Sequence, residues 1–209
     1  FCWIDQPSGK RSIAWTRGTA RPLSAREFCR ERIRASDLLH LDGHQMQAAL
    51  AAAKTARKHG VCVSIDAGTL VPGIEELLAL SDIIIASQPF AARFTGLRSP
   101  TAAVRKLFVP GCRFAGITLG KRGSIGFDGK QVFSCPQYEV PAEVDTTGAG
   151  DTYHGAFTFA VAQGRPWESC MRFATVVAAL KCTQLGGRTG IPNLKTAEQH
   201  LKKFETTIR

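Results

Sequence analysis

The chain has 209 residues, 44% of them hydrophobic, which is enough for one sizeable core, so we expect a single domain over residues 1–209. Its formal charge of +10 would suit an anionic partner. However, the 27 Lys and Arg residues are scattered along the sequence. A solvated helix face, or a field that attracts small phosphorylated ligands, explains them better than a nucleic acid partner, which we do not expect.

No stretch approaches the roughly eighteen consecutive apolar residues of a membrane span, and the start at Phe1 lacks the pattern of a signal peptide. We therefore expect no membrane association. The seven cysteines are an odd number and contain no Cys-x-x-Cys spacing. They indicate free thiols in a reducing cytoplasm.

Two β-prone runs, residues 1–4 and 12–16, are joined by turn-forming residues 5–9 and predict a hairpin. Because two strands alone are barely stable in water, we expect this hairpin to pack against other elements, either as a lid over a site or as part of a larger sheet. The next segment, Ser24-Ala25-Arg26-Glu27, has the spacing of a capping box and predicts a helix through about Ile33.

From there, strand and helix patterns alternate. Continuous apolar strands are predicted at residues 38–41, 61–65 and 83–86. Helices are predicted at residues 45–59, 73–80, 89–95 and from 99 onwards. Such alternation implies an α/β protein with a mostly parallel sheet covered by helices.

Short strands at residues 114–118, 124–127 and 131–134 then predict a small antiparallel extension. Three helices complete the chain. They are predicted from the glycine-rich stretch to about 163, from 166 to about 181, and from 196 towards the C-terminus.

The stretch Asp145-Thr146-Thr147-Gly148-Ala149-Gly150-Asp151-Thr152 precedes a long helical pattern. Glycines that open a helix leave backbone N–H groups uncovered, and the helix dipole favours an anion such as a phosphate. A carboxylate at Asp151 would repel a phosphoryl group unless it takes a proton from the attacking hydroxyl. The alternative is a tight turn in which Asp151 only favours the helix dipole.

Two other stretches resemble known nucleotide-binding motifs but do not match them. Residues 116–121 resemble a P-loop, but their glycines are one residue too close and Arg122 stands where Ser or Thr must hold Mg²⁺. The start Gly148-Ala149-Gly150 resembles a dinucleotide fingerprint, but Tyr153 occupies the place of its third glycine. His40 and His44 flank a strand end, so no helix presents them together, and we interpret them as two unrelated histidines rather than a metal site.

Residues 145–157 resemble the C-terminal signature of the ribokinase/PfkB family of carbohydrate kinases over thirteen consecutive positions. Residues 118–123, Thr-Leu-Gly-Lys-Arg-Gly, are similar to the family's nucleotide segment Thr-Leu-Gly-x-x-Gly. The resemblance extends to about Leu194. It implies a ribokinase-like, three-layer α/β/α fold that lacks its N-terminal third, with residues 1–20 as the remnant of a small β-lid.

The resemblance also implies roles. Asp151 would be the catalytic base, and the N–H groups of Gly148, Ala149 and Gly150 would form the anion hole for the transferred phosphoryl group. ATP and Mg²⁺ are the implied cofactors. The implied nucleotide-binding residues are Thr118, Gly120, Gly123, Gly186 and Gly187. For the first three of these, a plain hairpin turn is the alternative.

The sequence leaves more than one role open for several further residues. Asp145 and Thr147 resemble residues that hold a monovalent cation such as K⁺ in some members, although Gly190 stands where those members can have Ser. Asp42 follows a predicted strand, where open α/β sheets bind ligands, but it could equally be a turn acid. His44 sits where relatives place an Arg near the substrate.

Residues 41–44 and 83–90 look more like the ketohexokinase-like and sulfofructose-kinase-like branches than like ribokinase, and Ser87-Gln88-Pro89-Phe90 replaces the family's Asn-x-x-Glu. We therefore expect an ATP-dependent kinase of a small-molecule sugar, preferably a ketose. The alternatives are a ribokinase-type or nucleoside kinase and a non-catalytic sugar- or nucleotide-binding regulator. The resemblance further implies sugar-binding residues before Phe1 and a homodimer through the β-lid in the full-length protein.

Overall fold

The structure, a computed structural model, describes residues 1–5 and 11–207. Its contacts group the chain into two compact units. The first unit comprises residues Phe1–Ala20, Gly120–Gly123 and Cys135–Arg209. The second comprises residues Arg21–Leu119 and Ser124–Ser134.

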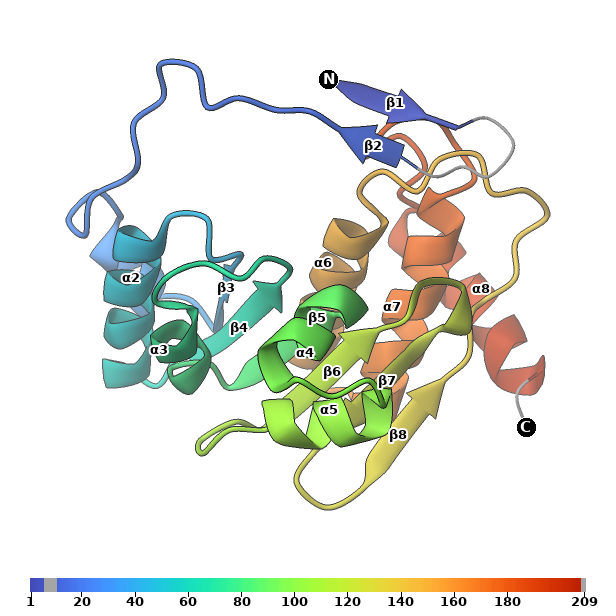
Figure 1. The fold of residues 1–209 in the computed structure, drawn as a ribbon. Coiled ribbons are helices and arrows are strands. Elements are labelled where there is room, and N and C mark those ends of the chain that lie inside the picture. Colours follow the sequence, from blue (N-terminus) through green and yellow to red (C-terminus); the bar gives the residue numbers. More distant parts are fainter. Residues whose placement is uncertain (6–10, 208–209) are drawn as a thin grey trace. The chain divides into compact units, whose positions relative to one another are not determined.

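A six-stranded sheet in the order β3-β4-β5-β6-β7-β8 forms the centre of the second unit (Figure 1). Its strands are β3 (Leu38–Leu41), β4 (Cys62–Ala67), β5 (Ile83–Ser87), β6 (Phe114–Thr118), β7 (Ser124–Phe127) and β8 (Val132–Cys135). The first four are parallel, as predicted, and β7 runs antiparallel to β6. The three late strands are therefore no separate extension: β6 belongs to the parallel part, and β7 and β8 continue the same sheet.

Helices α2, α4 and α5 contact the strands of this sheet, and α1 and α3 pack against α2. The helices of the unit are α1 (Arg30–Arg34), α2 (Met46–Lys58), α3 (Ile74–Ala79), α4 (Gln88–Thr95) and α5 (Pro100–Leu107). The core includes alternate strand residues such as Ile65, Ile84 and Ile117 together with the buried alanines of α2. Alternation places these strand residues on one face, and alanines let a helix approach that face closely.

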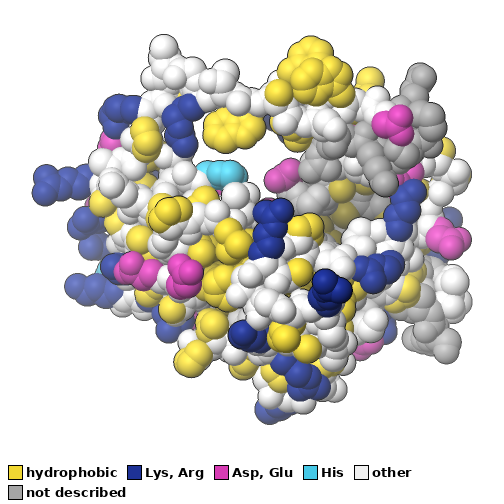
Figure 2. All heavy atoms as spheres, viewed as in Figure 1, with side chains coloured by type: hydrophobic (Ala, Val, Ile, Leu, Met, Phe, Trp, Pro, Cys, Tyr) yellow, Lys and Arg dark blue, Asp and Glu magenta, His cyan; other side chains and the backbone are white. Residues whose placement is uncertain are grey.

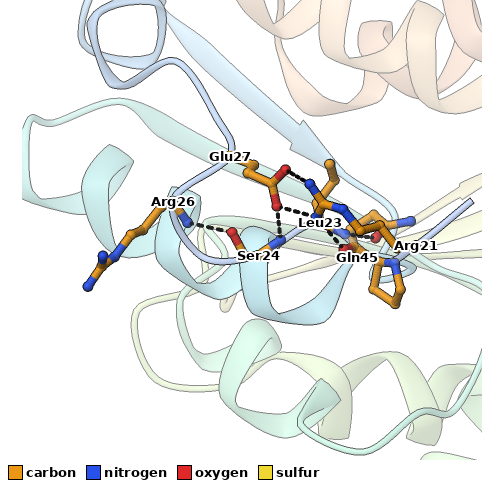
Figure 3. A network of polar contacts seen from close by, with 7 residues as sticks. Arg21, Leu23, Ser24, Arg26, Glu27 and Gln45 are labelled. Atoms are coloured by element: carbon orange, nitrogen blue, oxygen red, sulfur yellow. Dashed lines mark hydrogen bonds and ion pairs between the residues drawn. The ribbon is translucent and has the colours of Figure 1, made fainter.

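The predicted helix from Ser24 does not form there: Ser24 and its neighbours make a turn, and α1 begins only at Arg30. Half of the capping box is present, because the Ser24 N–H donates to the Glu27 carboxylate at 2.9 Å. Arg21 binds the same carboxylate through hydrogen bonds of 2.7 and 2.6 Å (Figure 3). Hydrogen bonding from Arg21 lowers the pKa of Glu27 to about 2. The box is thus part of an ion-paired turn, and the extended Cys29 separates it from the helix.

The described residues of the first unit form a hairpin, three α-helices and a short 3₁₀ turn (Figure 1). Strands β1 (Cys2–Ile4) and β2 (Arg11–Ile13) pair antiparallel, which confirms the predicted hairpin, while most of its predicted connection at 5–9 lies outside the described residues. The helices are α6 (Ala149–Ala162), α7 (Trp167–Lys181) and α8 (Leu194–Thr207). Helices α6 and α7 pack against each other, with the Phe157 and Trp167 rings stacked at 6.3 Å.

Among the described residues, no helix combines the length and apolar character that crossing a bilayer requires. Lys and Arg side chains are spread over the face seen in Figure 2 and do not gather into one patch on it.

Candidate active site

The glycine-rich stretch forms the N-terminus of α6. Gly148 is the N-cap residue and has φ +74°, a left-handed conformation that favours glycine. A Cβ at Gly148 would lie 2.6 Å from the carbonyl oxygen of Gly187, closer than side-chain atoms approach backbone. The structure therefore brings together Gly148 and Gly187, two residues far apart in the sequence, and leaves no room for a side chain between them.

Two of the three predicted anion-hole N–H groups remain available. The Ala149 N–H donates to the carbonyl oxygen of Thr146 at 3.1 Å and is used within the turn. By contrast, the N–H groups of Gly148 and Gly150 donate to no acceptor in the part of the chain that the structure describes. Asp151 lies in the first turn of the same helix with an exposed side chain. The helix start thus offers free N–H donors beside an accessible carboxylate.

Asp145 ties this helix start to the late glycine loop. Its side chain is fully buried, and one carboxylate oxygen accepts the Thr147 N–H at 2.8 Å while the other accepts the Gly186 N–H at 2.8 Å. Burial alone raises the pKa of Asp145, but hydrogen bonds from Thr147 and Gly186 and the charge of Lys181 outweigh burial, so the pKa lies below its ordinary value. Asp145 is therefore an ionised junction between the two glycine segments.

Lys181 is a site residue that the sequence reasoning missed. It is fully buried, and its Nζ donates to the backbone oxygen of Asp145 at 2.8 Å. The sequence did contain a signal, because Lys181 is a lone charge in the apolar run Val-Val-Ala-Ala-Leu-Lys-Cys of a predicted helix.

Asp151 stands at the edge of a cavity of about 380 Å³ within the first unit. The walls come from one side of α6, from α7, from the loop after Gly187 and from α8, and they are predominantly apolar, with Phe159, Phe173 and Ile191 among them. Arg188 also lines this cavity and is exposed, so a cation that the sequence reasoning did not single out shares the cavity with Asp151.

Of the other predicted nucleotide residues, Gly120 and Gly123 belong to the same unit as Gly148. They bound a short 3₁₀ turn and have φ of +60° and +81°. A Cβ at Gly123 would lie 2.0 Å from the Cys135 carbonyl oxygen, so this turn also requires glycine. Thr118 ends β6 in the second unit, where its hydroxyl donates to the Ala86 carbonyl oxygen at 3.4 Å.

The predicted substrate residues Asp42 and His44 also belong to the second unit. They lie in the exposed turn after β3, where the Asp42 carboxylate accepts the His44 N–H at 3.0 Å. This contact fits the alternative role of Asp42 as a turn acid. The described residues contain no cluster of three or more His, Cys, Asp or Glu side chains that could hold a metal ion.

The sequence pattern described as pfkB family carbohydrate kinase matches residues 1–194, which includes both glycine segments and Asp151. The chain belongs to the pfkB family of carbohydrate kinases. Within this family it is 36% identical to ribokinase from Arabidopsis thaliana over 165 residues, covering 75% of this chain and 42% of that protein. It is 31% identical to ribokinase from Haemophilus influenzae over 157 residues, covering 72% and 51%. The chain thus spans about half the length of these curated pfkB relatives, or less.

Solved structures of pfkB-type kinases show the same fold. Ribokinase from Thermotoga maritima superposes with a TM-score of 0.81 at 26% identity, over 97% of this chain and 68% of that one. Arabidopsis thaliana ribokinase, solved with ribose and ATP, gives a TM-score of 0.76 at 30% identity, over 83% and 58%. The predicted ribokinase-like α/β/α fold with a mostly parallel, helix-flanked sheet is therefore confirmed.

A first prediction concerns the contact between the two glycine segments. We expect Gly148→Ala to destabilise the protein by about 1–3 kcal/mol, because a Cβ would meet the Gly187 carbonyl and the residue would keep a left-handed backbone. Gly150→Ala is the control, since its Cβ would enter open space in a helix, and we expect it to be neutral or stabilising by up to about 1 kcal/mol. Chemical denaturation measures both, and equal stability of the two variants would contradict the role of this contact.

A second prediction concerns pH. Because the folded-state pKa of Asp145 lies below that of the unfolded chain, its contribution to stability is complete above the unfolded value of about 3.9 and is lost as pH falls through the folded value. We expect Asp145→Asn to flatten the acid branch of the stability curve and to cost about 1–3 kcal/mol at neutral pH, since one hydrogen-bond acceptor is lost. Denaturation from pH 7 down to acid pH is the measurement; an unchanged acid branch would argue against this role.

Proposed function

We propose that the protein is an ATP-dependent carbohydrate kinase that transfers the γ-phosphoryl group to a sugar hydroxyl. The observation that carries the proposal is the start of α6, where Asp151 stands exposed beside the free N–H groups of Gly148 and Gly150. A carboxylate that accepts a proton and donors that bind an anion are the two groups this reaction needs at adjacent positions. Membership of the pfkB family supports the same reaction.

In the proposed mechanism, Asp151 accepts the proton of the sugar hydroxyl as its oxygen forms a bond to the γ-phosphorus. The bond between the γ-phosphorus and the β–γ bridging oxygen breaks, and ADP leaves with that electron pair. The N–H groups at Gly148 and Gly150 stabilise the charge on the transferred group. Ala149 would join them only by giving up its bond to Thr146. Arg188, at the same cavity, is a further candidate for neutralising phosphate charge.

ATP and Mg²⁺ are the proposed cofactors, with the turn at Gly120–Gly123 and the loop at Gly186–Gly187 along the nucleotide. Mg²⁺, when bound with ATP, would supply charge neutralisation at the phosphates. One relative of the same family has been solved with ribose and ATP, which supports the nucleotide. A monovalent cation at Asp145 and Thr147 is not part of this proposal, because the Lys181 ammonium already contacts the Asp145 carbonyl.

The proposed acceptor is a small sugar. The sequence favours a ketose, with Asp42 and His44 as candidate contacts, whereas the relatives named ribokinase favour the alternative acceptor, ribose. The apolar cavity beside Asp151 offers few polar groups to a sugar, so we place the groups that select the sugar in the N-terminal third of a single kinase domain. We further propose a cytoplasmic location, which the free cysteines support.

We also propose that the hairpin of β1 and β2 is part of a lid through which two copies of the full-length protein associate. The hairpin and the residues that flank it expose Phe1, Trp3, Ile13 and Trp15, whose exposed fractions are 79, 53, 55 and 71%. Large apolar side chains gathered on one small element favour a protein interface.

The lid proposal gives a third prediction. We expect the double substitution Trp3→Ser with Trp15→Ser to weaken self-association of the full-length protein at least about tenfold, because two central aromatic anchors are removed. Leu70→Ser, an exposed apolar residue outside the hairpin, is the control and should leave association unchanged. Analytical ultracentrifugation measures the effect. A monomeric parent protein, or a dimer that is indifferent to the double substitution, would remove the lid interface.

The fourth prediction tests the chemistry. We expect Asp151→Asn in the full-length protein to reduce kcat by about 10²–10⁴-fold, because the general base is lost, while nucleotide affinity stays largely unchanged. Asp128→Asn, which alters a partly exposed turn carboxylate, is the control and should retain full turnover. Coupled detection of ADP release against a panel of ketoses, ribose and nucleosides measures kcat and identifies the acceptor.

Normal turnover by the Asp151→Asn variant would refute the mechanism. Nucleotide or sugar binding by the parent protein without ADP release on any acceptor would favour the alternative, a regulatory protein that keeps the kinase fold.

A further inference from the structure

Lys181 has no part in the mechanism above, yet it is fully buried at the end of α7. Burying an ammonium group is costly unless it is paired, so such a residue calls for a reason. Its Nζ donates to the backbone oxygen of Asp145 at 2.8 Å, and its positive charge helps to lower the pKa of the Asp145 carboxyl group. Lys181 therefore compensates a buried anionic residue that binds both Thr147 and Gly186.

The backbone around Lys181 also favours a cation. The Cys182 carbonyl oxygen, at the C-terminus of α7, accepts the N–H groups of Val144 at 2.8 Å and Asp145 at 3.1 Å. The segment that carries Asp145 thus crosses the helix end, where the helix dipole places partial negative charge. A buried carboxylate, a backbone carbonyl and a helix C-terminus together form a site that needs a positive charge.

The loop after Gly187 packs against the backbone of Lys181. A Cβ at Gly190 would lie 2.3 Å from the carbonyl oxygen of Lys181 and 3.0 Å from its carbonyl carbon. No side chain at position 190 can therefore reach into this region to complete a metal-ion site. The cation that the surrounding groups require comes from the protein chain itself.

We propose that Lys181 is a built-in cation that replaces a monovalent metal ion at Asp145 and so holds the two glycine segments in place. A potassium ion at this carbonyl does not fit, because the Lys181 ammonium occupies the position beside it. The ammonium is a compact charge with three donors, which suits the task. Its effect on phosphoryl transfer rests on the proposed kinase activity, and in that reaction Lys181 is a positioning residue that acts through Asp145.

The test uses the full-length protein with NaCl, KCl or methylammonium chloride at equal ionic strength. The melting temperature and the ATP dissociation constant are measured alongside kcat, because the first two need no kinase activity. For the parent protein, we expect all three to be the same in the three salts. For Lys181→Ala, we expect ATP affinity or kcat to fall at least about tenfold in NaCl and to recover in KCl or methylammonium chloride, since a cation can enter the vacated space.

Arg172→Ala is the matched control, because Arg172 is a partly buried cation on the same helix that pairs with Glu168 and Glu205. We expect no recovery by KCl or methylammonium chloride in this variant. Lys181→Met keeps the length of the side chain without its charge, and it should lose ATP affinity with little recovery because the space stays filled.

A parent protein whose melting temperature or kcat rises in KCl over NaCl would overturn the proposal, even if no Lys181 variant folds. Failure of both added cations to restore a folded Lys181→Ala variant would overturn it as well. A parent protein that phosphorylates no acceptor would refute the proposed function alone, since the melting and binding measurements would still decide the role of Lys181.

Discussion

The candidate site depends on the buried carboxylate of Asp145. Its two oxygens accept the N–H groups of Thr147, just before the glycine turn of α6, and of Gly186, in the loop after α7. The backbone carbonyl oxygen of Asp145 accepts a hydrogen bond from the Lys181 ammonium. Gly148 and Gly187 can then meet with no Cβ between them. Fixed backbone donors are useful for binding developing charge because they need no reorganisation when the phosphoryl group arrives. Asp145 is therefore the structural basis of the anion site that we propose at Gly148 and Gly150.

Charge is distributed unevenly in this unit. A buried anion a few residues from the proposed phosphate site would oppose the phosphate, and the adjacent Lys181 ammonium offsets that repulsion. Asp151 differs from Asp145 because its side chain is exposed and lines the cavity beside α6. Two carboxylates six residues apart thus differ in their surroundings: Asp145 fixes the backbone, and Asp151 is the accessible carboxylate to which we assign proton transfer.

The residues around Asp151 bear on which part of the domain selects the sugar. The elements that we propose to bind phosphate lie in residues 120–123 and 145–190, whereas the cavity beside Asp151 is lined mainly by apolar side chains such as Phe159 and Phe173. A sugar needs paired hydrogen-bond donors and acceptors, and unpaired ones at its hydroxyls would cost binding energy. This contrast is the reason for placing sugar selection in the part of the pfkB domain that the longer relatives have in addition.

The sequence by itself determined the α/β class, most helix and strand positions and the signature around Asp151, because these follow from local periodicity, capping residues and a contiguous motif. It failed at Ser24, where Arg21 and the extended Cys29 turned a capping box into a separate turn, and at Phe114–Thr118, because strand direction depends on partners distant in sequence. Only the tertiary structure decided that Gly148 meets Gly187, that the Ala149 N–H is already used, and that Lys181 reaches Asp145. The first and third of these contacts join segments tens of residues apart through burial and close approach, which no local pattern encodes, and the second depends on the exact geometry of the turn before α6.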